Sequence, residues 1–188
     1  MKLNKSVLPA LVLLIVAGSA FRVAGYAPQI AMAIFGAAVI KDKRLAFILP
    51  LFSMFLSDVI YQVLYNYGYL NFPGFYKGES FFDSQLLNYL LLAVLTVFGF
   101  LARNLKLNRI ILATLAAPVF YFLASNFLVW VGGAGLHRPQ TFDGLMMCYA
   151  DGLPFLRSSL QNTVVFSAIF FGGYYLVQRF VFTQKQLA

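Results

Sequence analysis

The sequence predicts an all-α, polytopic integral membrane protein. We expect residues 1–188 to form a single domain, a bundle of six transmembrane helices with both termini in the cytoplasm. Of the 188 residues, 61% are hydrophobic and 11% are charged, whereas soluble domains carry about 25% charged residues. The apolar residues form runs long enough to cross a bilayer core of about 30 Å. The basic residues stand in short clusters between these runs, a pattern that the positive-inside effect produces.

Six spans are expected, at residues 7–21, 28–40, 46–65, 85–102, 110–130 and 155–180. The second has about a dozen residues, or about 20 Å of helix, which is short for a crossing. The basic cluster at residues 41–44 falls on the same side as Lys2 and Lys5 only if the chain has crossed twice before it. Residues 22–29 are therefore expected to form an outer connection that dips into the membrane.

The distribution of Lys and Arg sets the orientation. By this arrangement, ten of the 14 lie on the side of the termini and four on the other side. The ten are Lys2, Lys5, Lys41, Lys43, Arg44, Arg103, Lys106, Arg109, Arg179 and Lys185, and the four are Arg22, Lys77, Arg138 and Arg157. Cytoplasmic loops carry the excess of basic residues. The net charge of +8 thus indicates a lipid bilayer as the partner, and no nucleic acid.

Two connections between the spans are long. Residues 65–82 hold eight aromatic residues, which are typical of an aromatic belt at the membrane surface. The alternative is a lid over a bound ligand, because long structured loops are often functional. Residues 131–154 are rich in glycine and too broken for a spanning helix, so we expect a loop there.

The span at residues 46–65 carries an acid, Asp58, past the middle of the membrane core. An ionisable group at this depth is costly and requires a partner or a function. Tyr61, Gln62 and Tyr65 follow within two turns and share a face with Asp58. Two interpretations remain open. Asp58 either pairs with an arginine inside the bundle, or lines a hydrated cavity and contacts a ligand, which is the interpretation we prefer.

Polar residues of several spans lie at a comparable depth in the outer half. Arg22, Asp58 and Arg157 are the charged ones, and they come from three different spans. Convergent polar groups in an apolar bundle are typical of a ligand pocket; the alternative is that Asp58 pairs with one arginine while the other reaches the outer headgroups. The candidate ligand-binding residues are Arg22, Gln29, Asp58, Tyr61, Gln62, Tyr65, Asn126, Trp130, Arg157 and Asn162.

Catalytic and metal-binding patterns are missing from the sequence. The chain has one histidine, His137, which we interpret as a surface residue, and one cysteine, Cys148, which we interpret as packed. Neither stands at a spacing typical of a metal site. Ser57 precedes Asp58, but consecutive helical side chains point about 100° apart and form no nucleophile–base pair. We therefore expect no enzyme, no metal site and no cofactor.

Four stretches carry a family resemblance. They are APQIAMAIFGAA at residues 27–38, LPLFSMFLSD at 49–58, SNFLVW at 125–130 and GLMMCYADGLPFLRSSL at 144–160. The chain resembles a bacterial family related to the substrate-binding S components of energy-coupling factor (ECF) vitamin transporters. The resemblance covers nearly the whole chain. It implies a six-helix bundle of the bacterial cytoplasmic (inner) membrane that captures a small molecule beneath its outer loops.

The resemblance also implies partners. In the related transporters, alanines spaced by four on the first span dock onto a membrane-embedded T component, which two cytoplasmic ATPases drive. Only Ala20 and Ala24 keep this spacing here, so a coupled and a solitary transporter both remain open. The expected function is that of a substrate-binding membrane subunit for uptake of a small vitamin-like molecule. The alternatives are an accessory subunit of another membrane complex and an intramembrane enzyme acting on lipid-linked substrates.

Overall fold

A computed structural model describes residues 7–69, 81–133 and 138–186. Its elements are α1 (Val7–Val23), α2 (Gln29–Val39), α3 (Lys43–Asn66), α4 (Phe81–Phe100), α5 (Leu107–Val131) and α6 (Phe142–Gln186). No strand occurs in these ranges, so the predicted all-α fold class is confirmed. Most of the proposed lid, at residues 70–80, and His137 lie outside the described residues.

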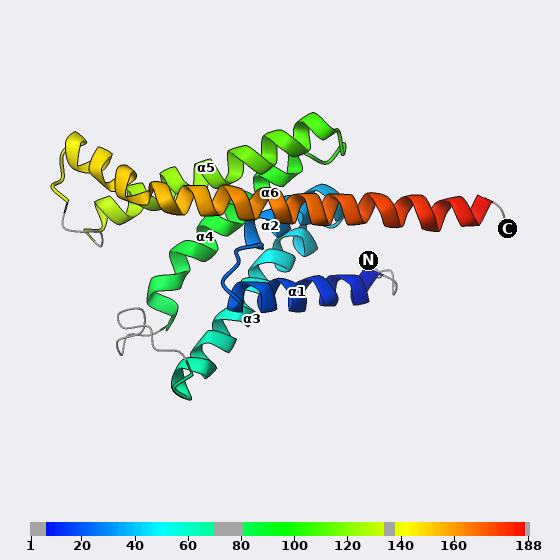
Figure 1. Cartoon of the computed structure of the whole chain (residues 1–188), viewed down its shortest axis with the longest axis horizontal. Coiled ribbons are helices and arrows are strands. Elements are labelled where there is room, and N and C mark those ends of the chain that lie inside the picture. The colour runs from blue at the N-terminus through cyan, green and yellow to red at the C-terminus, as the bar shows by residue number, and fades with distance from the viewer. Residues whose placement is uncertain (1–6, 70–80, 134–137, 187–188) are drawn as a thin grey trace.

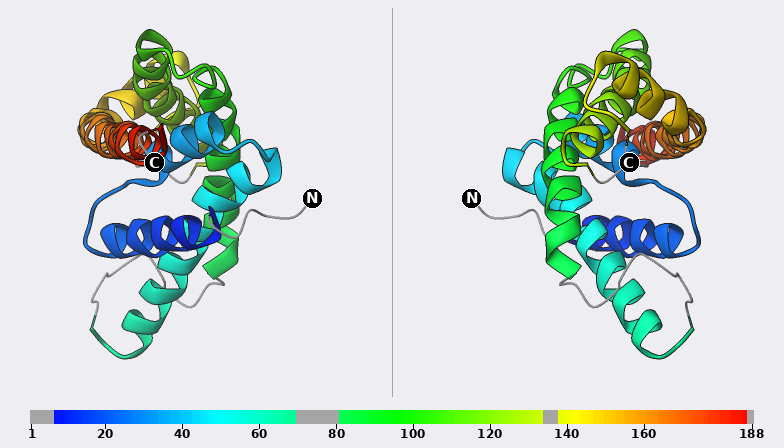
Figure 2. Two further views of the ribbon diagram at one scale, coloured as in Figure 1. Left: turned by 90° about the vertical axis from the view of Figure 1, so that its right-hand side faces the viewer. Right: turned by 90° about the vertical axis from the view of Figure 1, so that its left-hand side faces the viewer.

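The central helix is α2. Ten of its 11 residues are buried, and it packs against α3, α4, α5 and α6. Figure 2 shows α5 and α6 together on one side of the molecule, α1 and the last turns of α3 on the other, and α4 running between the two. The side chain of Phe35 connects α2 to α6 through ring contacts with Phe170, Phe171 and Tyr174.

Small residues allow the other helices to approach α2 closely. A Cβ added at Gly99 of α4 would lie 2.5 Å from the carbonyl oxygen of Ile34 and 2.7 Å from Cβ of Ala37. On the side of α3, a Cβ added at Gly36 would lie 3.0 Å from a methyl group of Leu49. Close approach of helix backbones is the usual role of small residues in membrane proteins. The alanine-rich second span therefore serves packing within this chain.

Gly99→Val is expected to destabilise the fold by at least about 1–3 kcal/mol, because the new side chain collides with the backbone of α2. Gly173 of α6 provides a matched control, since a Cβ added there meets no atom within 4 Å. Thermal unfolding in mild detergent should show a melting temperature several degrees lower for Gly99→Val than for Gly173→Val. Equal melting temperatures would contradict the close contact of α2 with α4.

Three helical segments are long and apolar enough to cross a membrane, namely α3, α5 and residues Phe142–Arg179 of α6. Shorter apolar helices within the described residues are Val12–Val23, Gln29–Val39 and Gln85–Phe100. Large hydrophobic side chains are exposed along the outer faces, for example Val63 on α3, Leu112 on α5 and Ile169 on α6. Extended apolar surfaces of this kind are rare on soluble monomers. Together with the composition, they indicate an integral membrane protein.

The last helix begins earlier than the sequence predicted. The expectation of a loop over residues 131–154 was wrong for residues 142–154, because α6 starts at Phe142 and continues for 45 residues. Gly152 does not interrupt this helix, since a Cβ there would lie only 2.5 Å from Oδ1 of Asn126 on α5 and glycine permits this contact. Pro154 lies inside the helix, where proline removes one hydrogen bond and causes a bend. Figure 1 shows the first turns of α6 inclined to the rest.

Candidate functional site

Arg22, in the last turn of α1, and Asp58, in α3, form an ion pair in the interior. Nη1 of Arg22 contacts Oδ1 of Asp58, whose side chain is 0% exposed, and the Arg22 side chain is 21% exposed. The other carboxylate oxygen of Asp58, Oδ2, accepts a hydrogen bond of 2.7 Å from the hydroxyl of Tyr89 on α4. Because both oxygens are engaged, the structure matches the alternative in which Asp58 pairs with an arginine inside the bundle.

Further contacts fix the position of Arg22. Nη1 also donates to Oγ of Ser57 at 2.6 Å and to the carbonyl oxygen of Met54 at 3.4 Å. The hydroxyl of Tyr61 donates to the carbonyl oxygen of Arg22 at 2.6 Å, and its ring centroid lies 5.5 Å from the guanidinium carbon. Among the described residues, every side-chain hydrogen bond of Arg22 runs through Nη1. Its Nε and Nη2 donors form an edge that fits the bidentate binding of a carboxylate or phosphate.

Beside Tyr89 on α4, amide and phenol groups form a second set of hydrogen bonds, which reaches α5. The hydroxyl of Tyr121 donates to Oδ1 of Asn88 at 3.2 Å, and Nδ2 of Asn88 donates to Oε1 of Gln85 at 3.1 Å. Hydrogen bonds therefore join polar groups of α1, α3 and α4 around one guanidinium, and Asn88, next to Tyr89 in the chain, adds Gln85 on α4 and Tyr121 on α5 to the set. We call this set the Arg22 network; it comprises Arg22, Ser57, Asp58, Tyr61, Gln85, Asn88, Tyr89 and Tyr121.

Comparison with protein families shows the family to which the chain belongs. The family described as "Family of unknown function (DUF6580)" matches residues 2–186. The chain is a member of DUF6580. No curated protein and no solved structure matches it. What the Arg22 network of this DUF6580 protein does must therefore be inferred from its own residues.

Five members of the network were not among the predicted ligand-binding residues of the DUF6580 chain, namely Ser57, Gln85, Asn88, Tyr89 and Tyr121. Gln85, Asn88 and Tyr89 stand at spacings of three and four on α4, so that they share one face. The same spacing identified Asp58 and Tyr61 in the sequence, and it provides a signal for the α4 residues as well. Tyr121 gave no such signal, because a tyrosine in an apolar span is equally typical of packing.

Other predicted residues border the network. Gln29, at the start of α2, is buried and donates from Nε2 to the carbonyl oxygen of Gly18 at 3.4 Å, which connects α2 to α1. Gln62 is half-buried on α3 and donates from Nε2 to Oδ1 of Asn66 at 2.9 Å. Tyr65 is half-buried one turn beyond Tyr61. Gln29 thus lies at the start of α2, and Gln62 and Tyr65 lie near the end of α3.

The remaining predicted residues lie on α5 and α6. The main chain of Asn126 accepts a hydrogen bond from the thiol of Cys148 at 3.5 Å, and Cys148 is buried as predicted. Nε1 of Trp130 donates to the carbonyl oxygen of Pro139 at 2.9 Å. Asn162 donates to the carbonyl oxygen of Ser158, one turn earlier on α6. The polar contacts of this group lie within the α5–α6 unit, apart from the Arg22 network.

Arg157 is the predicted residue that differs most from expectation. It is exposed on α6, and no hydrogen bond or ion pair of the described residues includes it. In the DUF6580 fold, α6 packs against α2 and α5, whereas Asp58 lies on α3, which packs against α1, α2 and α4. The structure therefore brings Arg22 and Asp58 together without Arg157. Within the described residues, no group of three or more His, Cys, Asp or Glu side chains is arranged to hold a metal ion.

Proposed function

We propose that this DUF6580 chain is the substrate-binding membrane subunit of an uptake system, similar to ECF S components, for a small vitamin-like molecule. One observation carries the proposal. Polar groups of α3 and α4 gather around Arg22 of α1, whose Nε and Nη2 donors make no hydrogen bond to the described residues. A few convergent polar groups in an apolar surrounding are typical of small-molecule sites.

In this proposal, Arg22 binds the substrate and Asp58 positions Arg22. The carboxylate of Asp58 and the hydroxyl of Ser57 hold Nη1, so the guanidinium is oriented before the substrate arrives. Orientation in advance raises affinity, because fewer side-chain conformations are lost on binding. The free edge of Arg22 recognises planar anionic groups best. A substrate with a carboxylate fits this chemistry, and the neighbouring phenols supply apolar contact and hydrogen bonds.

The proposed topology has six spans with both termini in the cytoplasm of a bacterium. It is supported by the ten-to-four distribution of Lys and Arg. The Arg22 network then lies in the outer half of the membrane. It is built at the ends of these helices, because Arg22 is in the last turn of α1, Tyr61 is near the end of α3 and Gln85 is near the start of α4.

Cysteine labelling tests this topology, after Cys148 has been replaced by serine. Lys43→Cys, at the start of α3, is expected to stay unlabelled when an impermeant thiol reagent is added outside intact cells. Tyr67→Cys, which follows the other end of α3 and replaces a side chain that is 76% exposed, should react. Labelling of position 43 from outside would show that the proposed orientation, or the proposed number of spans before α3, is wrong.

The energy source is part of the proposal. Ala20 and Ala24, which keep the alanine spacing of the docking motif, are exposed on and just after α1. They suit a contact with a T component that two ATPases drive, with a solitary transporter as the alternative. Co-purification from cells distinguishes the two. A stoichiometric T component would favour coupling, and a stoichiometric partner of another kind, with no small molecule bound, would favour an accessory subunit.

Mass spectrometry of bound small molecules tests the function itself. The wild-type protein and Arg22→Lys are purified in mild detergent and denatured, and the released molecules are compared. We expect one anionic small molecule in near-stoichiometric amount from the wild type and much less from Arg22→Lys. Equal amounts from both proteins would show that Arg22 does not hold the substrate. Chemical conversion of the molecule by the protein would indicate the intramembrane enzyme instead.

A further inference from the structure

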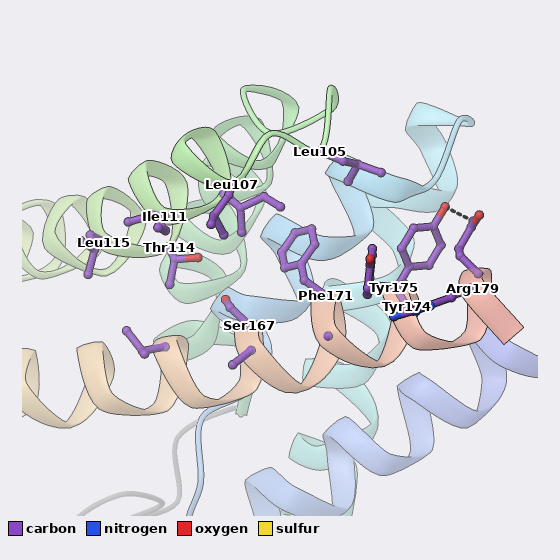
Figure 3. Close-up of a pocket in the computed structure, with 15 residues that line it drawn as sticks. Leu105, Leu107, Ile111, Thr114, Leu115, Ser167, Phe171, Tyr174, Tyr175 and Arg179 are labelled. Carbon is purple, nitrogen blue, oxygen red and sulfur yellow. Dashed lines mark hydrogen bonds between the residues drawn. The ribbon is translucent and has the colours of Figure 1, made fainter.

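A second site is formed by α5 and α6. A cavity of about 1090 Å³ lies between the first half of α5 and residues 164–179 of α6 (Figure 3). Its volume is slightly above the range of about 300–1,000 Å³ for small-molecule pockets. The wall is mainly aliphatic and aromatic, with Leu107, Ile111 and Phe171 among its residues. No residue of α1 or α3 lines it, so this cavity is separate from the Arg22 network.

Two hydroxyl groups lie deep in the cavity. Figure 3 shows Thr114 on α5 opposite Ser167 on α6. The two residues are only 6% and 4% exposed, and neither hydroxyl has a hydrogen-bond partner among the described residues. Serine and threonine in helices often donate to the carbonyl oxygen one turn earlier, but these two do not. An unpaired buried hydroxyl is unfavourable, so the occupant should supply oxygen acceptors at this depth.

The opposite end of the cavity is polar and basic. This end is lined by Tyr174, Tyr175, Gln178 and Arg179, and no acidic residue is among the lining residues. Leu105 and Leu107 line the cavity too, which places the basic cluster at residues 103–109 at the same end. In the topology proposed above, this end faces the cytoplasm. Basic pockets between transmembrane helices on that side bind anionic lipid headgroups.

The distance between the two polar ends limits the occupant. Ser167 and Arg179 are 12 residues apart on α6, which is about 18 Å along a helix. Figure 3 shows the side chain of Arg179 directed along α6 toward Tyr174 and Tyr175. The guanidinium of Arg179 therefore lies nearer to Ser167 than the main chain of Arg179 does. The occupant therefore carries an anionic group, then oxygen acceptors deeper in the membrane, and apolar chains around them.

We propose that the cavity binds one phospholipid with an anionic headgroup. Its phosphate lies at Arg179, its ester oxygens accept hydrogen bonds from Thr114 and Ser167, and its acyl chains cover the aliphatic wall. The positive charge at the Arg179 end of the cavity favours an anionic headgroup. The hydroxyls of Thr114 and Ser167 fix how deep the glycerol group lies. The bound lipid fills space between α5 and α6 that no side chain of the described residues occupies.

Native mass spectrometry of detergent-purified protein tests the proposal. Phosphatidylglycerol, phosphatidylcholine with the same acyl chains, and glycerol 3-phosphate are added in turn. We expect one phosphatidylglycerol per protein, bound about tenfold more tightly than phosphatidylcholine, which corresponds to one charge-assisted interaction. Glycerol 3-phosphate should not displace it. Displacement by glycerol 3-phosphate would show a site for soluble phosphates and overturn the proposal.

Adjacent glycines provide a matched pair of variants. Gly172 lines the cavity and Gly173 does not, and a Cβ at either position meets no atom within 4 Å. Gly172→Phe should reduce retention of phosphatidylglycerol at least about tenfold, while Gly173→Phe retains it. Arg179→Gln should abolish the preference for phosphatidylglycerol, and Thr114→Val with Ser167→Ala should weaken both lipids equally. Full lipid retention by Gly172→Phe would overturn the proposal. Conversion of a dimer to a monomer by this variant, with lipid unchanged, would instead show a contact between two copies of the chain.

Discussion

Asp58→Asn is expected to lower the free energy of unfolding by about 3–5 kcal/mol, because it leaves the guanidinium of Arg22 largely buried without its counterion. Asparagine still accepts one hydrogen bond from Tyr89 or Arg22, but it supplies no charge. For a protein of this length the loss corresponds to a fall of about 10 °C in the melting temperature. Thermal unfolding in detergent measures it. An unchanged melting temperature would contradict the buried pair and favour a hydrated cavity around Asp58.

Two further variants control for this effect. Arg22→Gln combined with Asp58→Asn removes both charges, and replacing a buried pair by neutral groups is often close to neutral in stability. The double variant should therefore recover most of the loss. Asp151→Asn removes the ion pair between Asp151 and Arg138. The side chain of Asp151 is 38% exposed and that of Arg138 is 34% exposed. Exposed pairs contribute about 0–1 kcal/mol, so this variant should melt close to the wild type.

Arg22→Lys is expected to weaken substrate binding by about tenfold to a hundredfold, with a much smaller change in stability. Lysine keeps a positive charge near Asp58 but has no second edge to present to a carboxylate. The loss of a charge-assisted hydrogen bond corresponds to about 1.5–3 kcal/mol. Titration of the purified variant with the molecule released from the wild type measures the change.

Arg157→Lys is the control for this titration. It changes the same side chain at an exposed position of α6 and should leave the affinity unaltered. If Arg157→Lys weakened binding as much as Arg22→Lys, the site would include α6, as the sequence alone suggested. Full affinity in Arg22→Lys would place the substrate away from the Arg22 network.

The sequence predicted those features that depend on position along one helix. Five of the six expected spans end within four residues of the helices α1 to α5, because apolar runs and basic clusters mark where a chain meets the membrane surface. The depths of Arg22 and Asp58, and the shared face of Asp58 and Tyr61, follow from helical spacing. These properties suffice to predict that Arg22 and Asp58 lie at one level.

Rotation of the helices about their axes was not available from the sequence. Arg157 and Asn126 have a suitable depth, but only the packing of α6 against α2 and α5 determines that Arg157 is exposed and that the side chain of Asn126 lies beside Gly152 of α6. The start of α6 was missed for a related reason. In the sequence, Gly152 suggests the interruption of a helix. In the structure, glycine is required there because the side chain of Asn126 occupies the space that a Cβ atom would fill. Contacts between distant segments decide both cases.

A measurement of uptake into cells is the direct test of the proposed role of this protein in transport. Cells that produce the wild-type chain, Arg22→Lys, Arg157→Lys or no chain are supplied with the labelled form of the molecule released from the purified protein. We expect accumulation in cells with the wild type and with Arg157→Lys, and about tenfold or greater loss of affinity for uptake with Arg22→Lys. Equal accumulation in cells that lack the chain would contradict a role in uptake.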